Sequence, residues 1–351
     1  MHALRFTRLA TALVVALSVT AARAVTVDWV TVGDPGNAAD DTTYGAVADS
    51  FRIMRYEWTN AQYVDFLNAV DPNGTNPNSI YNNSMGSNAR GGISFTNGNT
   101  AGSKYAARTN MGDKPVNYVS WFDAARVANW LHNGQGSGST ETGAYTLSGT
   151  TEGDAPAVNP GASFYIPTED QWYKAAYYKG SGTNAGYWDY ATQSDTDPTE
   201  VTADGTGVGS AGSAGNFANY NYAADWNSQN GNVTTVGTNG GASAYGTFDM
   251  SGNILEWNDL TGAVDTSRGW RGGDWGSDAI GASSSTRYAF APSNEDSSVG
   301  FRLASPLSGP SGVPEIDPAG VSLVAALVAG GLALLERRRL RGQPGMCRRT
   351  T

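Results

Sequence analysis

The residues that most restrict the chemistry of this 351-residue chain are its cysteine and its histidines. The single cysteine, Cys347, lies four residues from the C-terminus, and the only histidines are His2 and His132. The rest of the chain therefore has no thiol for a disulfide, a nucleophile or a thiolate metal site. A zinc site of His/Cys type and a Ser-His-Asp triad are disfavoured. His132 falls at an expected helix end, where the helix dipole alone favours histidine.

The N-terminus has the pattern of a secretory signal. Arg5 and Arg8 form a basic start, residues 9–20 are mostly apolar, and Ala22-Arg23-Ala24 fits a small-x-small cleavage site. We therefore expect a signal peptide over residues 1–24, removed by signal peptidase, and a mature chain that begins at Val25. A retained N-terminal anchor is the alternative.

The C-terminus has the pattern of a membrane anchor. A linker and short Pro-Glu motif over residues 306–318 precede an apolar run over residues 319–335 and a basic tail over residues 336–351. Seventeen residues of helix span roughly 25 Å, enough for a thin hydrocarbon core. The arginine cluster predicts that this tail is cytoplasmic and that the preceding body is outside. A buried core helix is the alternative interpretation.

The motif, the apolar run and the arginine cluster together resemble the PEP-CTERM sorting signal of Gram-negative bacteria. The resemblance implies cleavage by an exosortase near Pro314-Glu315 and delivery to the cell surface, the outer membrane or the extracellular matrix. Ile316 stands where the second proline of that signal usually lies, so the match is a variant one. Cys347 would be discarded with the tail.

The part of the chain between these ends is strongly acidic. Three arginines lie in the signal and six in the tail, which leaves 13 basic residues in the body; Glu315, Asp317 and Glu336 lie at the C-terminal end, which leaves 29 acidic ones. The resulting charge of about −16 disfavours nucleic acid and anionic lipid as partners. It is compatible with Ca²⁺, which takes oxygen ligands.

Glycine is abundant, with 45 residues, and helix signals are few, so residues 25–305 predict one irregular, loop-rich α+β domain. Long loops are expected over residues 73–100, 134–153 and 180–215. A strand is predicted over residues 51–56, and helices are predicted over residues 59–69, after the capping box Ser120/Asp123, and after residues 167–171. Short strands and loops should follow as far as residues 300–303.

Six segments, taken in order, resemble the formylglycine-generating enzyme (sulfatase-modifying factor) family. They are residues 56–63, 115–121, 165–172, 245–257, 271–275 and 300–304, which include Asp249-Met250-Ser251-Gly252-Asn253-Ile254-Leu255-Glu256-Trp257 and Gly300-Phe301-Arg302. The resemblance covers roughly residues 26–305. It implies the fold of that family, a single irregular domain related to the C-type lectin fold.

The resemblance also implies calcium. The family binds Ca²⁺ at the segment that matches the side chains of Asp249 and Glu256 and the backbone carbonyls of Gly252 and Ile254. Two carboxylates and two carbonyls within eight residues are hard oxygen ligands of the kind that Ca²⁺ prefers. A second family site maps near Asn219, with uncertain partners. The alternative is that Asp249 and Glu256 only cap local turns.

The catalytic site implied by the resemblance is incomplete. Active relatives use two cysteines that bind copper and oxidise a substrate cysteine to formylglycine. That pair would fall within residues 283–292, which contain no cysteine. Serine cannot replace thiolate as a ligand of Cu(I), so we expect neither copper nor the oxidase reaction.

What remains is a groove in which active relatives bind a peptide. The residues expected to line it are Ser285, Arg287, Tyr288, Trp270, Trp275 and Asp274. Arg287 would pair with a carboxylate or sulfate, and the tryptophans would stack on a sugar or a peptide. The alternative is that both tryptophans belong to the core.

Three functions are compatible with these observations. The first is a non-catalytic, Ca²⁺-stabilised module that is displayed at the cell surface and binds a peptide or glycan. The second is a divergent enzyme of the family with a non-cysteine active site built from carboxylates such as Asp274, Asp123 and Glu169. The third is a purely structural surface protein.

Overall fold

The computed structural model describes residues 24–307. The sorting motif, the predicted membrane segment and the basic tail lie outside these residues, as does the predicted signal peptide apart from Ala24. Within residues 24–307, no helix is both long enough and apolar enough to cross a membrane.

Capping boxes begin the three longer helices. In each, the hydroxyl of the cap residue accepts from the backbone N–H three residues on, and the side chain of that third residue accepts from the cap N–H. The predicted box at Ser120 and Asp123 is confirmed, and the other two begin at Thr59 and Thr168. The helices are α1 (Asn60–Val70), α2 (Ser84–Ser87), α3 (Trp121–His132) and α4 (Glu169–Tyr177).

Two sheets organise the domain. The first, in the order β1-β2-β11, joins the N-terminal strands to the last strand; the second has the order β10-β7-β8-β9, with β9 at one edge. Two further sheets have two strands each, β3-β4 and β5-β6. The strands are β1 (Trp29–Val32), β2 (Phe51–Met54), β3 (Ile93–Phe95), β4 (Tyr105–Ala107), β5 (Thr199–Glu200), β6 (Phe217–Ala218), β7 (Leu255–Asn258), β8 (Arg268–Arg271), β9 (Tyr288–Phe290), β10 (Val299–Gly300) and β11 (Ala304–Pro306).

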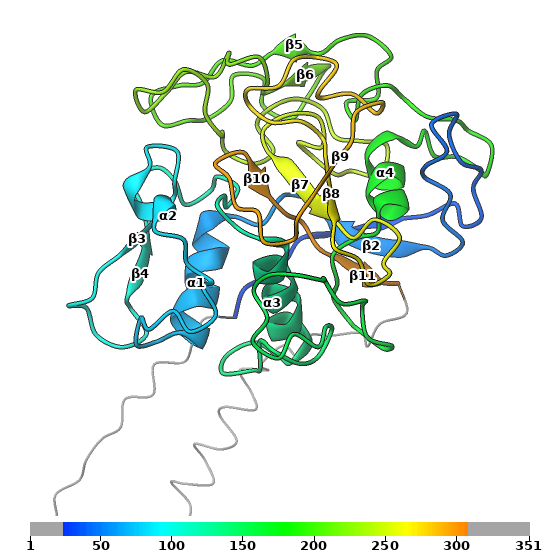
Figure 1. The fold of residues 1–351 in the computed structure, drawn as a ribbon. Helices are drawn as coiled ribbons and strands as arrows, with labels where there is room; N and C mark the ends of the chain where they lie inside the picture. The colour runs from blue at the N-terminus through cyan, green and yellow to red at the C-terminus, as the bar shows by residue number, and fades with distance from the viewer. Residues whose placement is uncertain (1–23, 308–351) are drawn as a thin grey trace, which may run out of the picture.

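The largest apolar core packs α1 and α3 against residues of the second sheet, such as Leu255, Trp257 and Trp270. A second core lies between the first sheet and α4. Figure 1 shows the second sheet near the middle of the domain, with α1 and α3 on one side and the loops around β5 and β6 on the other. The residues of β7 and β8 are all buried, whereas those of β9 are exposed.

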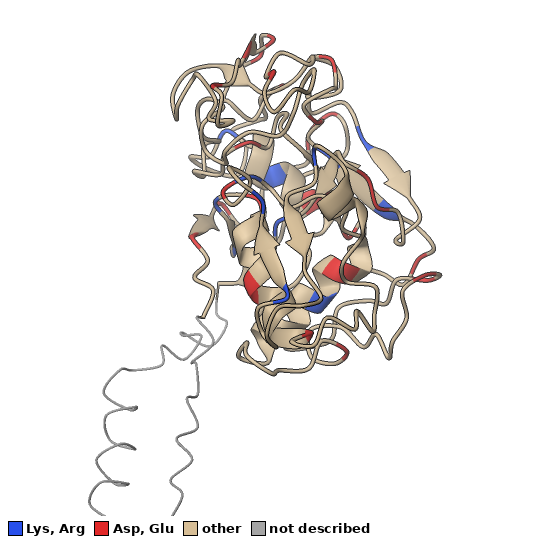
Figure 2. Cartoon of the chain, turned by 90° about the vertical axis from the view of Figure 1, so that its left-hand side faces the viewer, with Lys and Arg blue, Asp and Glu red and all other residues tan. Residues whose placement is uncertain are grey.

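The predicted α+β class and the irregular, loop-rich character are confirmed. The prediction of an uninterrupted loop over residues 73–100 is wrong, because α2 and β3 form there, and residues 180–215 contain the short strand β5. Residues 134–153 contain no helix or strand, as expected. Figure 2 shows acidic residues spread over loops on several sides of the domain.

Candidate functional site

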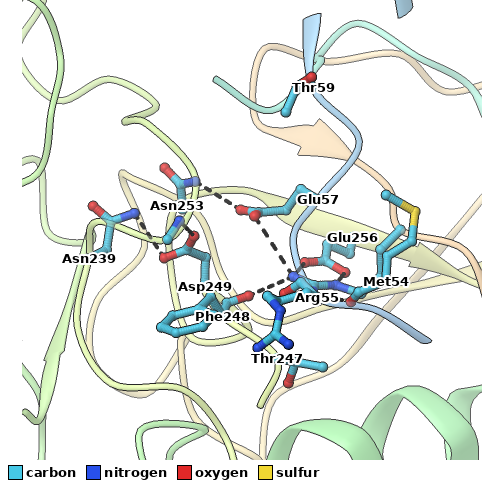
Figure 3. A network of polar contacts seen from close by, with 12 residues as sticks. Met54, Arg55, Glu57, Thr59, Asn239, Thr247, Phe248, Asp249, Asn253 and Glu256 are labelled. Atoms are coloured by element: carbon cyan, nitrogen blue, oxygen red, sulfur yellow. Dashed lines mark hydrogen bonds and ion pairs between the residues drawn. The ribbon is translucent and has the colours of Figure 1, made fainter. Parts of the chain in front are cut away.

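Arg302 is the centre of a buried polar network beside the second sheet. Its side chain is fully buried, and its Nε and Nη2 each lie 2.6 Å from an oxygen of Glu256. The same guanidinium donates to the backbone carbonyls of Met54 at 3.0 Å and Phe248 at 2.8 Å. Arg302 therefore ties three segments that are distant in the sequence (Figure 3).

Glu256 lies on β7 and has no exposed surface. Besides the two contacts with Arg302, its Oε2 accepts a 2.8 Å hydrogen bond from the indole of Trp172 on α4. Both carboxylate oxygens are thus taken by donors of the protein. The side chain acts here as the counter-charge of Arg302.

Asp249 is also buried, and its backbone has a positive φ of 61°. The carboxylate accepts from the backbone N–H of Gly237 and, at 2.9 Å, from the side-chain amide of Asn239. Burial raises the pKa of Asp249, and these two hydrogen bonds act in the opposite direction.

Glu57 is a third buried carboxyl group of this network. Its Oε1 accepts from the amide of Asn253 at 2.8 Å, whereas its Oε2 has no hydrogen bond and lies 3.9 Å from Arg302. Burial, reinforced by the charge of Asp249, raises the pKa of Glu57 well above its ordinary value. Three carboxyl groups, counting Glu256, thus share one guanidinium, so the network favours an additional proton or cation.

Asn219 and Gly252 are brought into close contact. The backbone N–H of Asn253 donates to the carbonyl of Asn219 at 2.7 Å, and a Cβ at Gly252 would lie 2.4 Å from that carbonyl oxygen. Gly252 has a φ of +91°, so both its backbone conformation and the space require glycine. The predicted calcium segment and the second predicted position are therefore neighbours in the fold.

The oxygens of the predicted calcium ligands are not equally free. Glu256 and Asp249 are occupied as described, and the carbonyl of Gly252 accepts from the N–H of Ile254 at 2.9 Å. The Oδ1 of Asn219, by contrast, is buried without a hydrogen-bond partner, as is Oε2 of Glu57. Among residues 24–307 there is no group of three or more acidic, histidine or cysteine side chains arranged to hold a metal. A cation fits the Asn219 side of the network better than the Asp249–Glu256 pair.

The six residues predicted to line a groove lie in three places. Trp270 on β8 and Tyr288 on β9 are directly paired across the two strands. Trp270 is 7 % exposed and lines a pocket, whereas Tyr288 is 39 % exposed. Trp275 is buried in a small separate cluster, with the Arg90 guanidinium 4.0 Å from the centre of its ring.

The remaining three predicted residues make local contacts. Arg287 forms a bidentate pair with Glu169 at 2.7 and 2.9 Å, while more than a third of its side chain stays exposed. Ser285 is exposed, and its hydroxyl lies 2.8 Å from that of Ser283. Asp274 accepts from the hydroxyl of Ser277 within its own turn.

The remaining residues with possible chemical roles are Glu169, His132 and Asp123. Glu169 begins α4 and is shared by Arg271 and Arg287. His132 ends α3 and accepts from the backbone N–H of Ser163 at 3.1 Å, in agreement with its predicted structural role. Asp123 is buried in its capping box, but it also contacts Glu295, a residue that the sequence analysis did not consider.

Glu295 lies at the wall of an open pocket of about 630 Å³, next to Trp270 and Phe290. Burial, reinforced by the charge of Asp123, raises the pKa of Glu295 to about 7, and burial raises the pKa of Asp123 to about 6. Because neighbouring carboxylates repel each other when both are ionised, these shifts favour a proton on the pair near neutral pH. This arrangement can exchange a proton with a ligand in the pocket.

Sequence reasoning missed two kinds of residue. Glu57 and Arg302 lie within the motifs used for the family resemblance, and a lone charge among aromatic neighbours in Tyr56-Glu57-Trp58 and Gly300-Phe301-Arg302 indicates a buried ion pair. Glu295 and Asn82, whose amide donates to Glu295 at the pocket wall, are the second kind, and nothing in their local sequence distinguishes them from ordinary loop residues.

Comparisons with known proteins give a family and a set of structural neighbours. The family described as sulfatase-modifying factor enzyme 1-like domain (FGE-sulfatase) matches residues 26–307. No curated protein matches the chain. Solved structures that resemble it include Treponema denticola variable protein 1, with 17 % identity, coverage of 79 % of this chain and 94 % of that chain, and a TM-score of 0.45.

Two other structures are similar to a comparable extent. CarF has 21 % identity, covers 80 % of this chain and 99 % of its own, and has a TM-score of 0.46. PvdO from Pseudomonas aeruginosa has 19 % identity, coverage of 80 % and 92 %, and a TM-score of 0.40. Because the family match extends over nearly all of the described residues, the chain belongs to the FGE-sulfatase family of sulfatase-modifying factor 1-like domains.

Proposed function

We propose that this chain is an exported, surface-anchored member of the family that binds a peptide or glycan and does not generate formylglycine. The observation that carries the proposal is the residue types of segment 283–292, where the family resemblance places the copper-binding cysteines. Ser283 and Ser285 contact each other there through their hydroxyls. Hydroxyl groups are hard ligands and cannot hold Cu(I) as thiolates do.

The edge strand β9 supports a binding function. It is the outer strand of the second sheet, and all three of its residues are exposed. An edge strand with free backbone groups can pair with an extended peptide, and its exposed side chains add specificity. Tyr288 and Arg287 supply an aromatic ring and a partly exposed guanidinium beside this edge.

The proposed localisation rests on the two ends of the chain, which lie outside the described residues. Signal peptidase would remove residues 1–24, and an exosortase would act near Pro314-Glu315. The apolar run over residues 319–335 would hold the body at the membrane until then. Detection of the mature body in a surface fraction, with residues 336–351 absent, is the expected result.

Calcium is part of the proposal. The Oδ1 of Asn219 and the Oε2 of Glu57, which accept no hydrogen bond, support a cation on that side of the network. Ca²⁺ there would stabilise the fold by satisfying buried oxygens and offsetting carboxylate charge. The relation of this fold to the C-type lectin fold likewise stays a prediction.

The calcium test is elemental analysis of the purified chain, paired with thermal unfolding with and without a chelator. We expect about one or two calcium ions per chain and a melting temperature that the chelator lowers. Asn219→Ala should reduce both effects, whereas Asp274→Ala, in its local turn, should change neither. Stoichiometric copper or iron would contradict the proposal.

The activity test uses a cysteine-containing peptide incubated with the copper-supplemented chain. Mass spectrometry should find no conversion of cysteine to formylglycine. In parallel, the labelled chain is applied to arrays of peptides and of glycans. Capture by one array supports the binding function, and Arg287→Ala or Phe290→Ala should weaken it. Absence of capture by both arrays would instead favour the purely structural role.

A divergent enzyme is the second candidate, because Glu295, one of two neighbouring carboxyl groups, lines a pocket. Of the three carboxylates first considered, Asp274 and Glu169 are held in a local turn and an ion-pair cluster, whereas Asp123 contacts Glu295 at the pocket wall. A proton shared between two carboxyl groups is a source of general acid and base. Substrate turnover that Glu295→Gln abolishes would favour this second function.

A further inference from the structure

The pocket beside β9 has a mixed aromatic and polar lining. Its volume of about 630 Å³ lies within the range of small-molecule sites. Its walls come from the residue range before α2, from β8 and β9, and from the segment between β9 and β10. The lining residues are Asn82, Trp270, Phe290, Ser293, Asn294, Glu295, Asp296 and Ser298.

One wall is an aromatic platform. The rings of Trp270 and Phe290 are 4.0 Å apart between centroids and inclined by 31°. Trp270 is 7 % exposed and Phe290 is 36 % exposed. Because one face of Phe290 lies against Trp270, the opposite face and the edge of the ring supply its exposed surface. That face carries the negative side of the ring quadrupole and attracts weakly positive C–H groups.

The same platform contains an unsatisfied donor. The indole N–H of Trp270 has no hydrogen-bond acceptor in the protein, although the residue is more than nine-tenths buried. Buried indole N–H groups normally have a partner, because an unmade hydrogen bond costs about 1–3 kcal/mol. Because the nitrogen itself is buried, the donors and acceptors for a ligand in the pocket come from the other lining residues.

The polar part of the lining, around Asn82 and Glu295, offers hydrogen-bond donors and acceptors that form no ion pair with a buried cation. The amide of Asn82 donates to Glu295, and the carboxyl group of Glu295 also contacts that of Asp123. Asp123 accepts from both the backbone N–H and the hydroxyl of Ser120. The cation whose charge acts on Asp123, Arg126, is already paired with Glu141 at 2.8 Å.

The raised pKa of Glu295, caused by burial and the neighbouring Asp123, favours its protonated form and so reduces the charge of this wall. Glu295 can then donate or accept a hydrogen bond, and the neutral side chains of Asn82, Asn294, Ser293 and Ser298 surround it. Asp296, the remaining acidic residue of the lining, accepts from the backbone and the hydroxyl of Ser298. Such a wall suits a ligand with several uncharged hydroxyl groups better than an ion.

From these observations we infer that the pocket is a subsite for one ring of a neutral saccharide. The apolar C–H face of the sugar lies on the open face of Phe290. Hydroxyl groups of the sugar hydrogen-bond to Glu295 and Asn82. The inference rests on the proposed binding function and specifies a glycan as the ligand.

The test is saturation-transfer NMR on the full chain with neutral methyl glycosides of glucose, galactose, mannose and N-acetylglucosamine. Choline and an acidic sugar, methyl glucuronide, serve as charged probes. We expect at least one neutral glycoside to bind with millimolar affinity, as a single shallow subsite allows, and neither charged probe to bind more tightly.

Three variants locate the binding. Phe290→Ala should weaken it about tenfold or more, because it removes the stacking surface. Phe95→Ala is the matched control, since Phe95 is a 37 % exposed phenylalanine on β3 outside the pocket lining, and it should leave binding unchanged. Trp270→Phe, which keeps a ring against Phe290, should weaken binding by less than Phe290→Ala.

The outcomes separate this inference from the proposed function. Binding of neutral glycosides that Phe290→Ala removes and Phe95→Ala keeps supports the subsite. Binding only of choline, or no weakening in Phe290→Ala, overturns it. If the arrays capture the chain through peptides while no glycoside binds, the subsite fails and the binding function stands. If no array and no probe captures the chain, both fail.

Discussion

Two clusters of buried carboxyl groups in this domain are neutralised in different ways. In the Arg302 network, the fully buried guanidinium donates two hydrogen bonds of 2.6 Å, one to each carboxylate oxygen of Glu256. At the pocket, burial and the neighbouring Asp123 raise the pKa of Glu295 to about 7, so this pair favours a proton as its counter-charge. A guanidinium is a permanent part of the fold, whereas a proton exchanges with solvent.

This difference separates a structural role from a binding role. Arg302 connects β7, the segment after β2 and the segment around Phe248, so its loss would open the middle of the domain. Glu295 connects only to Asn82 and Asp123, and part of it faces a pocket. We therefore expect substitutions in the first cluster to act on stability and substitutions in the second to act on binding and pH dependence.

The largest effect is expected for Arg302→Met. The substitution keeps an apolar stem but leaves Glu256 buried without its partner, which should destabilise the fold by about 3–5 kcal/mol. Urea unfolding followed by tryptophan fluorescence measures this. Arg55→Met is the control, because the Arg55–Asp28 pair is exposed and should contribute less than about 1 kcal/mol. Equal losses in the two variants would contradict a central role for Arg302.

A smaller effect is expected for Trp172→Phe, which removes the indole donor to Glu256. The matched control is Trp58→Phe, since both tryptophans are fully buried but the indole N–H of Trp58 has no acceptor. The loss of ring volume is common to both variants. The excess destabilisation of Trp172→Phe should be about 1–2 kcal/mol in thermal unfolding. No excess would mean that this hydrogen bond adds nothing to the Arg302 network.

The next largest effect is the pH dependence of stability that arises from Glu295 and Asp123 at the pocket. Burial raises the pKa of Glu295 from 4.5 to about 7, so between these values the folded state holds more protons than the unfolded state. Stability is then fully present below pH 4.5 and falls as the pH rises through 7. Burial also raises the pKa of Asp123, so its titration changes stability in the same direction. Burial and the charges of both carboxyl groups raise the pKa of Tyr63.

Glu295→Gln should remove the contribution of Glu295 and flatten the profile. The loss of stability between pH 4.5 and 8 should be about 1 kcal/mol smaller in the variant than in the unchanged protein, a modest difference because Glu295 is partly exposed. Unfolding free energies at intervals from pH 4 to 8 measure this. Glu152→Gln on an exposed loop is the control and should leave the profile as it is. A profile that is the same in both variants would show that the pair holds no shared proton.

The smallest effect on stability is expected for Arg287→Ala. Its pair with Glu169 has good geometry, but more than a third of the Arg287 side chain is exposed and Arg271 also holds Glu169. The loss should stay below about 1 kcal/mol and decrease with added salt. A loss comparable to that of Arg302→Met would place Arg287 among the structural residues rather than the binding residues.

Part of this molecule could be predicted from local sequence. The helix starts near Thr59, Ser120 and Thr168 were readable, because a cap and its partner are only three residues apart. The helix and strand near the N-terminus followed from hydrophobic spacing. The small elements α2 and β3 within residues 73–100 were missed, because four- and three-residue elements depend on tertiary contacts.

The candidate sites were less predictable than the helices. Asn219 and Gly252 were each singled out, but their direct contact depends on a chain reversal that no local pattern indicates. The six predicted groove residues are distributed over a sheet edge, a buried cluster and local turns. Glu295 and Asn82 are separated by 213 residues, and their contact forms only when β9 and β10 pack beside the segment before α2.

The sequence by itself determined the residue types and hence the possible chemistry. No cysteine precedes Cys347, which predicts that the body holds no copper-binding thiolate, and its excess of about sixteen acidic over basic residues predicts that it repels anionic partners. Only the tertiary structure decided which carboxyl groups are paired with a guanidinium and which share a proton. That choice depends on distances between side chains far apart in the sequence, and electrostatic interactions depend steeply on both distance and burial.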